Sequence, residues 1–262
     1  MVEILIAFII EVVCTVGVIA AGGLLISLCN KTFYKNVGTG ARTICYVTGA
    51  IGTPVHELSH ALFCVIFGHK IEEIKLFQLN SEDGTLGYVQ HSYNPKNVYQ
   101  KMGNFFIGIG PILVISGLLY LGACLLIPST VGAVTTGIRS INAQGGISGA
   151  LGVLLETFKA FFGAAVTLRW WIFVVLGAFF ALHMNLSVPD VKGALSGLVF
   201  LLLALLVLDV VLRLIGIGMI YGAIRVAVSC GVFLSLFLSM ALLINLILLG
   251  ASFVFRLVKK KK

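Results

Sequence analysis

Long apolar runs dominate the 262-residue sequence and restrict what it can fold into. Hydrophobic residues make up 59% of the chain and charged residues only 11%, and the mean hydropathy is +1.09. A water-soluble domain cannot bury that much apolar surface, so the composition indicates a polytopic membrane protein. The net charge of +8 is then better explained by loop topology and contact with anionic lipid than by nucleic-acid binding.

Six apolar segments approach the roughly 20 residues that an α-helix needs to cross a bilayer. They cover approximately residues 4–28, 44–68, 104–127, 170–188, 194–212 and 227–255. We therefore expect an all-α polytopic membrane protein with about six transmembrane helices, forming a single membrane domain over residues 1–262. An interfacial amphipathic helix is expected around residues 149–165.

One segment between these spans has the pattern of a β-hairpin. From residue 71 to residue 79, apolar and polar side chains roughly alternate, and residues 85–91 are again strand-like. The cluster Asn80–Gly84 between them is rich in turn-forming residues. We expect a short hairpin over residues 71–91, directly after the second apolar segment.

The second apolar segment, from about Ile44 to Gly68, contains the motif His56-Glu57-Leu58-Ser59-His60. On a helix the two histidines are four residues apart and therefore face the same side. That spacing suits two imidazole ligands on one zinc ion, with Glu57 beside them as a general base. Because imidazoles and carboxylates are costly in hydrocarbon, a functional role is the default interpretation.

A catalytic zinc ion needs a third protein ligand and an open position for water. The candidates are the remaining histidines and the acids near apolar spans, namely His69, His91, His183, Glu11, Asp190 and Asp209. Asp190 is the first choice because it lies in a polar break, residues 185–193, between two apolar runs. Asp209 has an alternative partner in Arg213, four residues on. His183 could be a spare ligand, could orient a ligand from behind, or could be an ordinary packed histidine.

These features resemble the site-2 protease-like family of intramembrane zinc metalloproteases. In that family a short β-element follows the H-E-x-x-H helix, and a later span carries an Asn-x-x-Pro-x-x-Asp-Gly type motif that supplies an aspartate ligand. Asn185, Pro189, Asp190 and Gly193 resemble this motif, although here the aspartate follows the proline directly. The resemblance covers a core of about residues 40–200, and the extra C-terminal spans, about 194–255, have no counterpart in it.

The resemblance implies a zinc metalloendopeptidase with Zn²⁺ held by His56, His60 and Asp190 and with Glu57 as the catalytic base. A helical substrate must unwind before cleavage, and the hairpin edge, with Gly87, Tyr88 and Val89, is expected to bind it as an added strand. The expected partners are a single-span membrane protein or signal-peptide substrate, the lipid bilayer and a regulatory membrane partner. The expected location is multi-pass in the plasma membrane of a prokaryote.

Two other functions remain open from the sequence. A zinc-binding but proteolytically inactive membrane scaffold or chaperone would use the same metal ligands. A metal-ion transporter would also place histidine and aspartate in the membrane. Transporters often show repeated halves and paired broken helices, and the sequence shows neither.

Overall fold

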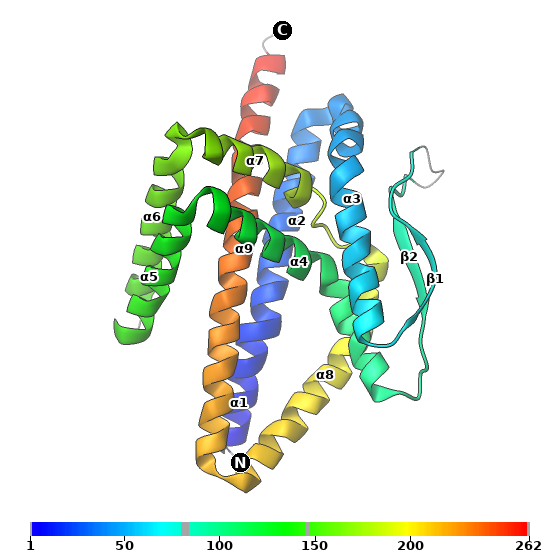
Figure 1. Cartoon of the computed structure of the whole chain (residues 1–262), viewed down its shortest axis with the longest axis vertical. Helices are drawn as coiled ribbons and strands as arrows, with labels where there is room; N and C mark the ends of the chain where they lie inside the picture. Colours follow the sequence, from blue (N-terminus) through cyan, green and yellow to red (C-terminus); the bar gives the residue numbers. More distant parts are fainter. Residues whose placement is uncertain (1, 80–83, 145–146, 261–262) are drawn as a thin grey trace.

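The computed structural model describes residues 2–79, 84–144 and 147–260, and it is 85% helical. The chain forms helices and two strands in the following order (Figure 1): α1 Val2–Val12, α2 Val18–Val37, α3 Ala41–Ile66, β1 Lys70–Lys75, β2 Tyr88–Ser92, α4 Val98–Leu126, α5 Pro128–Gln144, α6 Ile147–Gly163, α7 Leu168–Ala181, α8 Val188–Ile215 and α9 Ile217–Lys260. The mostly helical fold with a small hairpin agrees with the sequence prediction.

The long helices α2 and α9 run side by side through the centre of the molecule (Figure 1). A π-helical turn joins α1 to α2 in one line. The chain then reverses direction at Gly38, where φ is 67°, and α3 returns alongside. Helix α4 crosses the bundle and packs against α3 and α8. Helices α5 and α6 form a separate pair at one side (Figure 1).

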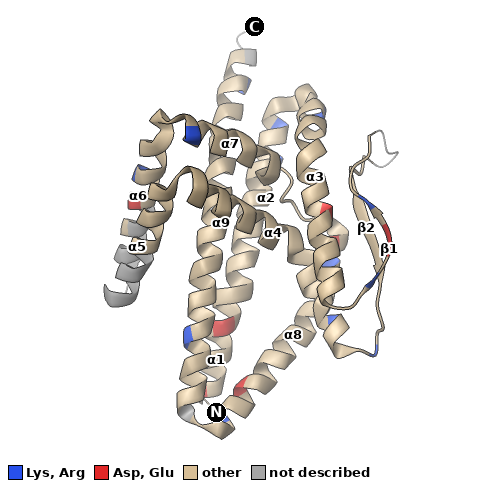
Figure 2. Ribbon diagram, in the orientation of Figure 1, with Lys and Arg blue, Asp and Glu red and all other residues tan. Residues whose placement is uncertain are grey.

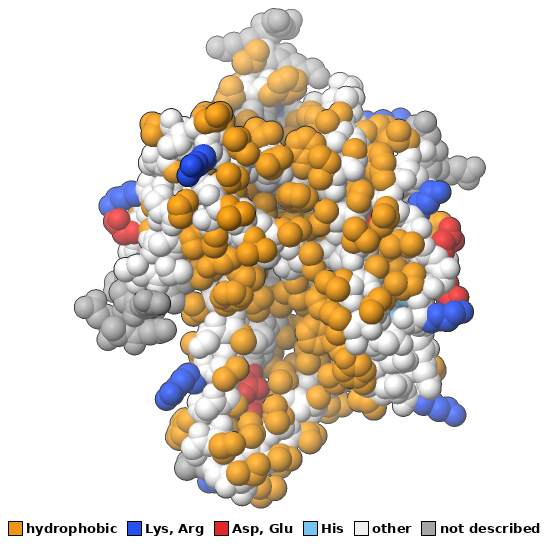
Figure 3. All heavy atoms as spheres, viewed as in Figure 1, with side chains coloured by type: hydrophobic (Ala, Val, Ile, Leu, Met, Phe, Trp, Pro, Cys, Tyr) orange, Lys and Arg blue, Asp and Glu red, His pale blue; other side chains and the backbone are white. Residues whose placement is uncertain are grey.

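The buried core lies where α2, α4, α7 and α9 meet. It is built from branched aliphatic and aromatic side chains, including Ile26, Ile115, Leu119, Phe173 and Ile244. Outside this core, many large apolar side chains are exposed. Figure 3 shows hydrophobic side chains spread over one whole face, with most charged side chains toward its margins. An exposed apolar surface of this extent requires a non-aqueous environment. The fold is therefore compatible with a multi-pass membrane protein.

The predicted number of six spans is not confirmed. Among the described residues, four helical stretches are long and apolar enough to cross a membrane, or five if a bent pair is counted as one span. The whole run Val2–Ile66 forms one such stretch, although Figure 1 shows its reversal between α2 and α3. The predicted span 170–188 coincides with α7, whose 14 residues reach only about 21 Å at 1.5 Å per residue. Helix α7 forms the bent pair together with the end of α6, at an angle of 110°.

The hairpin is present where the sequence predicts it. Strands β1 and β2 are antiparallel, from Lys70 opposite Ser92 to Lys75 opposite Tyr88, with a bulge between Ile71 and Glu73. Figure 1 shows β2 between α3 and β1. Most of the predicted turn, residues 80–83, lies outside the described residues, and Gly84 after it has a φ of 77°.

Two helical glycines allow the elements around α3 to approach closely. A Cβ atom at Gly52 would clash with the carbonyl oxygen of Phe179, and one at Gly108 would clash with the carbonyl oxygen of Asp190. Gly52 therefore lets the end of α7 and the His183 ring lie against α3, and Gly108 lets the start of α8 lie against α4. Any larger residue at these positions would separate the elements.

We expect Gly108→Ala to lower stability by about 1–3 kcal/mol, because the new methyl group would push α8 away from α4. The matched control is Gly117→Ala in the same helix, where an added Cβ meets no atom within 4 Å and helix propensity improves. Thermal unfolding of the purified protein in detergent measures both changes. Equal melting temperatures for the two variants would contradict the packing role of Gly108.

Candidate metal centre

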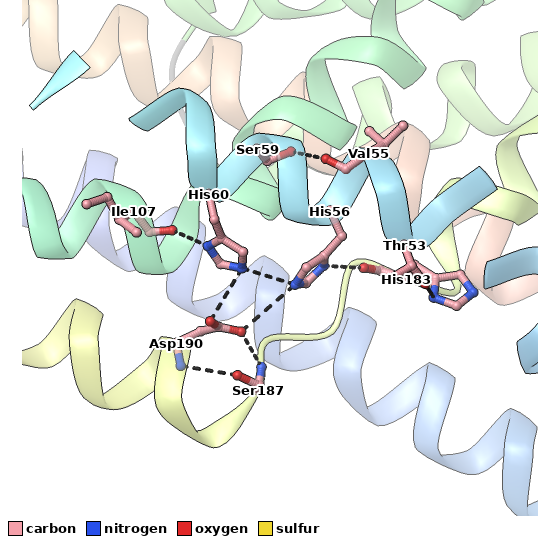
Figure 4. A network of polar contacts seen from close by, with 9 residues as sticks. All are labelled: Thr53, Val55, His56, Ser59, His60, Ile107, His183, Ser187 and Asp190. Atoms are coloured by element: carbon pink, nitrogen blue, oxygen red, sulfur yellow. Dashed lines mark hydrogen bonds and ion pairs between the residues drawn. The ribbon is translucent and has the colours of Figure 1, made fainter. Parts of the chain in front are cut away.

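Two histidines from α3 and one aspartate from α8 meet at a single point (Figure 4). The Nε2 atoms of His56 and His60 are 3.1 Å apart. The Oδ1 atom of Asp190 lies 3.4 Å from His60 Nε2, and its Oδ2 atom lies 3.9 Å from His56 Nε2. The structure thus brings together the three residues that the sequence selected as metal ligands.

Backbone carbonyls from two other elements fix both imidazole rings. His56 Nδ1 donates to the carbonyl oxygen of His183 at 2.7 Å, and His60 Nδ1 donates to the carbonyl oxygen of Ile107 at 2.7 Å. A carbonyl oxygen can only accept, so each ring carries its proton on Nδ1. In the neutral imidazoles both Nε2 atoms are therefore bare acceptors. Metal-binding histidines are commonly oriented in this way by a hydrogen bond from the second nitrogen.

The carboxylate of Asp190 is held by the first turn of its own helix. Ser187 is the N-cap of α8, and its hydroxyl accepts a hydrogen bond from the backbone N–H of Asp190 at 3.2 Å. In return, Asp190 Oδ2 accepts from the backbone N–H of Ser187 at 2.7 Å. This reciprocal capping box fixes the side chain, and the positive end of the helix dipole favours its negative charge.

The donor set fits a divalent metal ion. Two imidazole acceptors and a carboxylate converge, and without a cation between them their lone pairs would repel one another. A tetrahedral zinc ion with bonds of about 2.0–2.1 Å separates its ligand atoms by about 3.3 Å, close to the distances of 3.1 and 3.4 Å observed here. His56, His60 and Asp190 would hold the ion and leave one position open for water or substrate.

Glu57 lies beside this group in a cavity of about 620 Å³. Its side chain comes from the same helix face as the histidines, and the residue is only 6% exposed. The carboxylate has no hydrogen-bond partner within the described part of the chain, so it is free to act on a molecule in the cavity. A buried carboxylate of this kind next to a metal site has the position of a general base.

Strand β2 forms one wall of the same cavity. Gly87, Tyr88 and Val89, which the sequence selected as the substrate-binding edge, all line it. A Cβ atom at Gly87 would lie 2.8 Å from the Glu57 Cγ atom, so glycine lets the hairpin backbone pass next to the glutamate. Within the described residues β1 pairs with only one edge of β2, and an unpaired strand edge can accept an added strand.

Two of the alternative third ligands, Asp209 and Glu11, lie apart from the metal group. Asp209 is fully buried and lies beside Glu11. Glu11 lies in α1 and Asp209 in α8, and Figure 2 shows few acidic residues along these helices. The predicted pairing of Asp209 with Arg213 is wrong, because the Arg213 side chain contacts Glu3 at 2.8 Å instead. The start of α1 and the end of α8 are close there, a proximity that helical spacing cannot reveal.

His183 supports the site through its backbone and not through its ring. Its ring contacts the hydroxyl groups of Thr48 and Thr53 at 2.9 and 3.4 Å. Burial, and to a lesser degree the charge of His56, lowers the pKa of this imidazole to about 4. Its role is therefore the orientation of His56, which is one of the alternatives that the sequence left open.

Several residues of the cavity wall are not among those predicted from the sequence. Asn104 of α4 lines the cavity and is 6% exposed, and Ile107 contributes only a carbonyl, which no motif could reveal. The capping box was visible as Ser187-x-x-Asp190 but was not used. His91 also lines the cavity, and burial, followed by the charges of His69 and His60, lowers its pKa.

Metal analysis can test the ligand set directly. We expect purified protein to hold about one zinc ion per chain, and His56→Ala and Asp190→Asn to hold much less because each loses a ligand. Asp209→Asn is the matched control and should keep its zinc, since Asp209 lies away from the centre. Normal zinc in Asp190→Asn would exclude Asp190 as the third ligand, and equal zinc in His56→Ala would exclude the centre as a whole.

Comparison with known proteins supports the same chemistry. Residues 49–165 match a family model described as "Putative zincin peptidase". No curated protein and no solved structure matches the chain. The matched segment contains His56, Glu57 and His60 together with the hairpin, while Asp190 lies beyond it. Over this segment the chain is similar to zinc peptidases of the zincin type, and this similarity supports a zinc-dependent metallopeptidase.

Proposed function

We propose that this protein is an intramembrane zinc metalloendopeptidase of the site-2 protease type. The observation that carries the proposal is the convergence of His56, His60 and Asp190 beside Glu57, in a cavity bordered by an open β-strand edge. The two histidines lie six and ten residues before the end of α3 at Ile66, which is about 9–15 Å along the helix axis. A site at that depth supports cleavage within the bilayer.

The residues of the chain divide the chemistry between them. Zinc bound by His56, His60 and Asp190 would supply acidity to a water molecule and polarise the peptide carbonyl. Glu57 would accept the proton of the attacking water and pass it to the leaving amine. The capping box and the carbonyls of His183 and Ile107 hold the ligands in place, so little rearrangement is needed. The open edge of β2 would bind the unwound substrate through backbone hydrogen bonds.

The proposed substrates are single-span membrane proteins or signal peptides. Their transmembrane helices expose apolar side chains like those on the outer surface of this protein, and once unwound they offer free backbone groups to β2. A regulatory membrane partner and a location in a prokaryotic plasma membrane are part of the same proposal.

Glu57→Gln separates a peptidase from an inactive zinc-binding scaffold. Glutamine has nearly the same shape but cannot accept the proton, so cleavage of a co-expressed single-span reporter should fall about 100- to 10,000-fold. Zinc content should stay at the wild-type level because Glu57 is not a ligand. A Glu57→Gln variant that cleaves as well as wild type would favour the scaffold.

Proline substitutions test the open edge of β2. Successive backbone N–H groups of a strand point alternately toward and away from its neighbour, so Tyr88→Pro and Val89→Pro remove one inward and one outward donor between them. We expect the proline that removes the N–H pointing away from β1 to lower cleavage about three- to tenfold, which corresponds to the loss of one hydrogen bond. Zinc content should not change. Ile74→Pro in β1 is the control for general damage to the hairpin. If cleavage is unchanged or rises in both β2 variants, the hairpin is only a plug at the cavity.

A further inference from the structure

Two histidines outside the metal group, His69 and His91, form a chain of contacts that links α4 to the cavity. His69 lies between α3 and β1 and is 6% exposed, and His91 lies in β2. Their Nδ1 atoms are 3.1 Å apart. The second nitrogen of His69, Nε2, contacts the carbonyl oxygen of Gln100 in α4 at 2.8 Å. The metal centre and its ligands do not use either residue.

These contacts determine where the protons are in the neutral pair. The Gln100 carbonyl accepts, so His69 carries its proton on Nε2 and its Nδ1 is an acceptor. His91 must then donate from Nδ1, which leaves His91 Nε2 as a bare acceptor. This nitrogen has no hydrogen-bond partner in the described part of the chain, and the residue lines the cavity.

The local structure holds His91 in this position. Ile71 is opposite His91 across the hairpin, next to the bulge, and bulges commonly redirect side chains near functional sites. Behind it, the His69 ring stacks on Tyr93, with centroids 5.0 Å apart. Such packing would not be needed for a side chain that simply faces solvent. Burial, followed by the charges of neighbouring histidines, lowers the pKa of His91, so the acceptor form is the one presented.

We propose that His91 is a catalytic residue that binds the substrate, with its Nε2 atom accepting a hydrogen bond from a backbone N–H of the unwound peptide. His69 is the positioning residue that sets its tautomer. An unwound chain held in the cavity must satisfy its free N–H groups, and an acceptor next to the β2 edge meets that need. The inference rests on the proposed function and adds a residue to its substrate site.

Hydroxamates can test this without turnover, since they bind zinc through their own oxygens. The probes are the hydroxamate of N-acetyl-leucyl-leucine, its analogue with both amide nitrogens methylated, and acetohydroxamate, each titrated into zinc-loaded protein. His91→Phe keeps a ring but removes both nitrogens. We expect it to weaken the dipeptide probe about three- to tenfold and to leave the methylated analogue and acetohydroxamate unchanged.

Variants of His69 test the positioning role. Glutamine can donate to the Gln100 carbonyl and accept from His91, so His69→Gln should retain affinity for the dipeptide probe. His69→Leu can do neither and should match His91→Phe. Equal losses in His69→Gln and His69→Leu would show that the pair only clamps the hairpin to α4, and would overturn the positioning role.

The outcomes distinguish the proposed role of His91 from the proposed peptidase function. If His91→Phe binds the dipeptide probe as wild type does, or loses affinity equally for the methylated analogue, the role of His91 is excluded while the peptidase stands. If zinc-loaded wild type fails to bind acetohydroxamate, the open metal position is excluded and both proposals fall.

Discussion

The structure depends on one electrostatic constraint, which is the convergence of three electron-rich ligand atoms inside an apolar protein. His56, His60 and Asp190 would repel one another at distances of 3.1–3.9 Å unless a cation lies between them. Each is held from behind by a backbone group, so the site is prepared before the metal binds. The carbonyl of His183 and that of Ile107 both serve this purpose. Such preparation reduces the reorganisation needed during catalysis.

Close helix packing brings the carbonyls of His183 and Ile107 next to the metal ligands. Gly52 admits the loop that carries His183, and Gly108 admits the start of α8 with Asp190. Both approaches would be blocked by a single methyl group. In lipid, helices associate mainly through close packing. The small residues of α3 and α4 permit this packing and thereby bring the metal ligands and the carbonyls that orient them together.

In the proposed peptidase, the hairpin would bind the peptide substrate. Its position beside α3 places an open strand edge, a glutamate and an imidazole along one cavity. Binding of zinc requires only its ligands, whereas a peptidase must also bind an extended chain. The combination of Glu57 with the β2 edge therefore favours a peptidase over a scaffold that merely stores the ion.

The sequence by itself determined the membrane class, the hairpin and the H-E-x-x-H helix, because composition and short-range spacing encode them. It also selected Asp190, through a polar break between apolar runs. The predicted number of six spans is not confirmed, because hydropathy does not register the bend before α7 or the short length of that helix. Only the tertiary structure showed the carbonyls of His183 and Ile107 and the pairing of His69 with His91. Those contacts join residues 22–127 positions apart, and backbone oxygens carry no signal in a sequence.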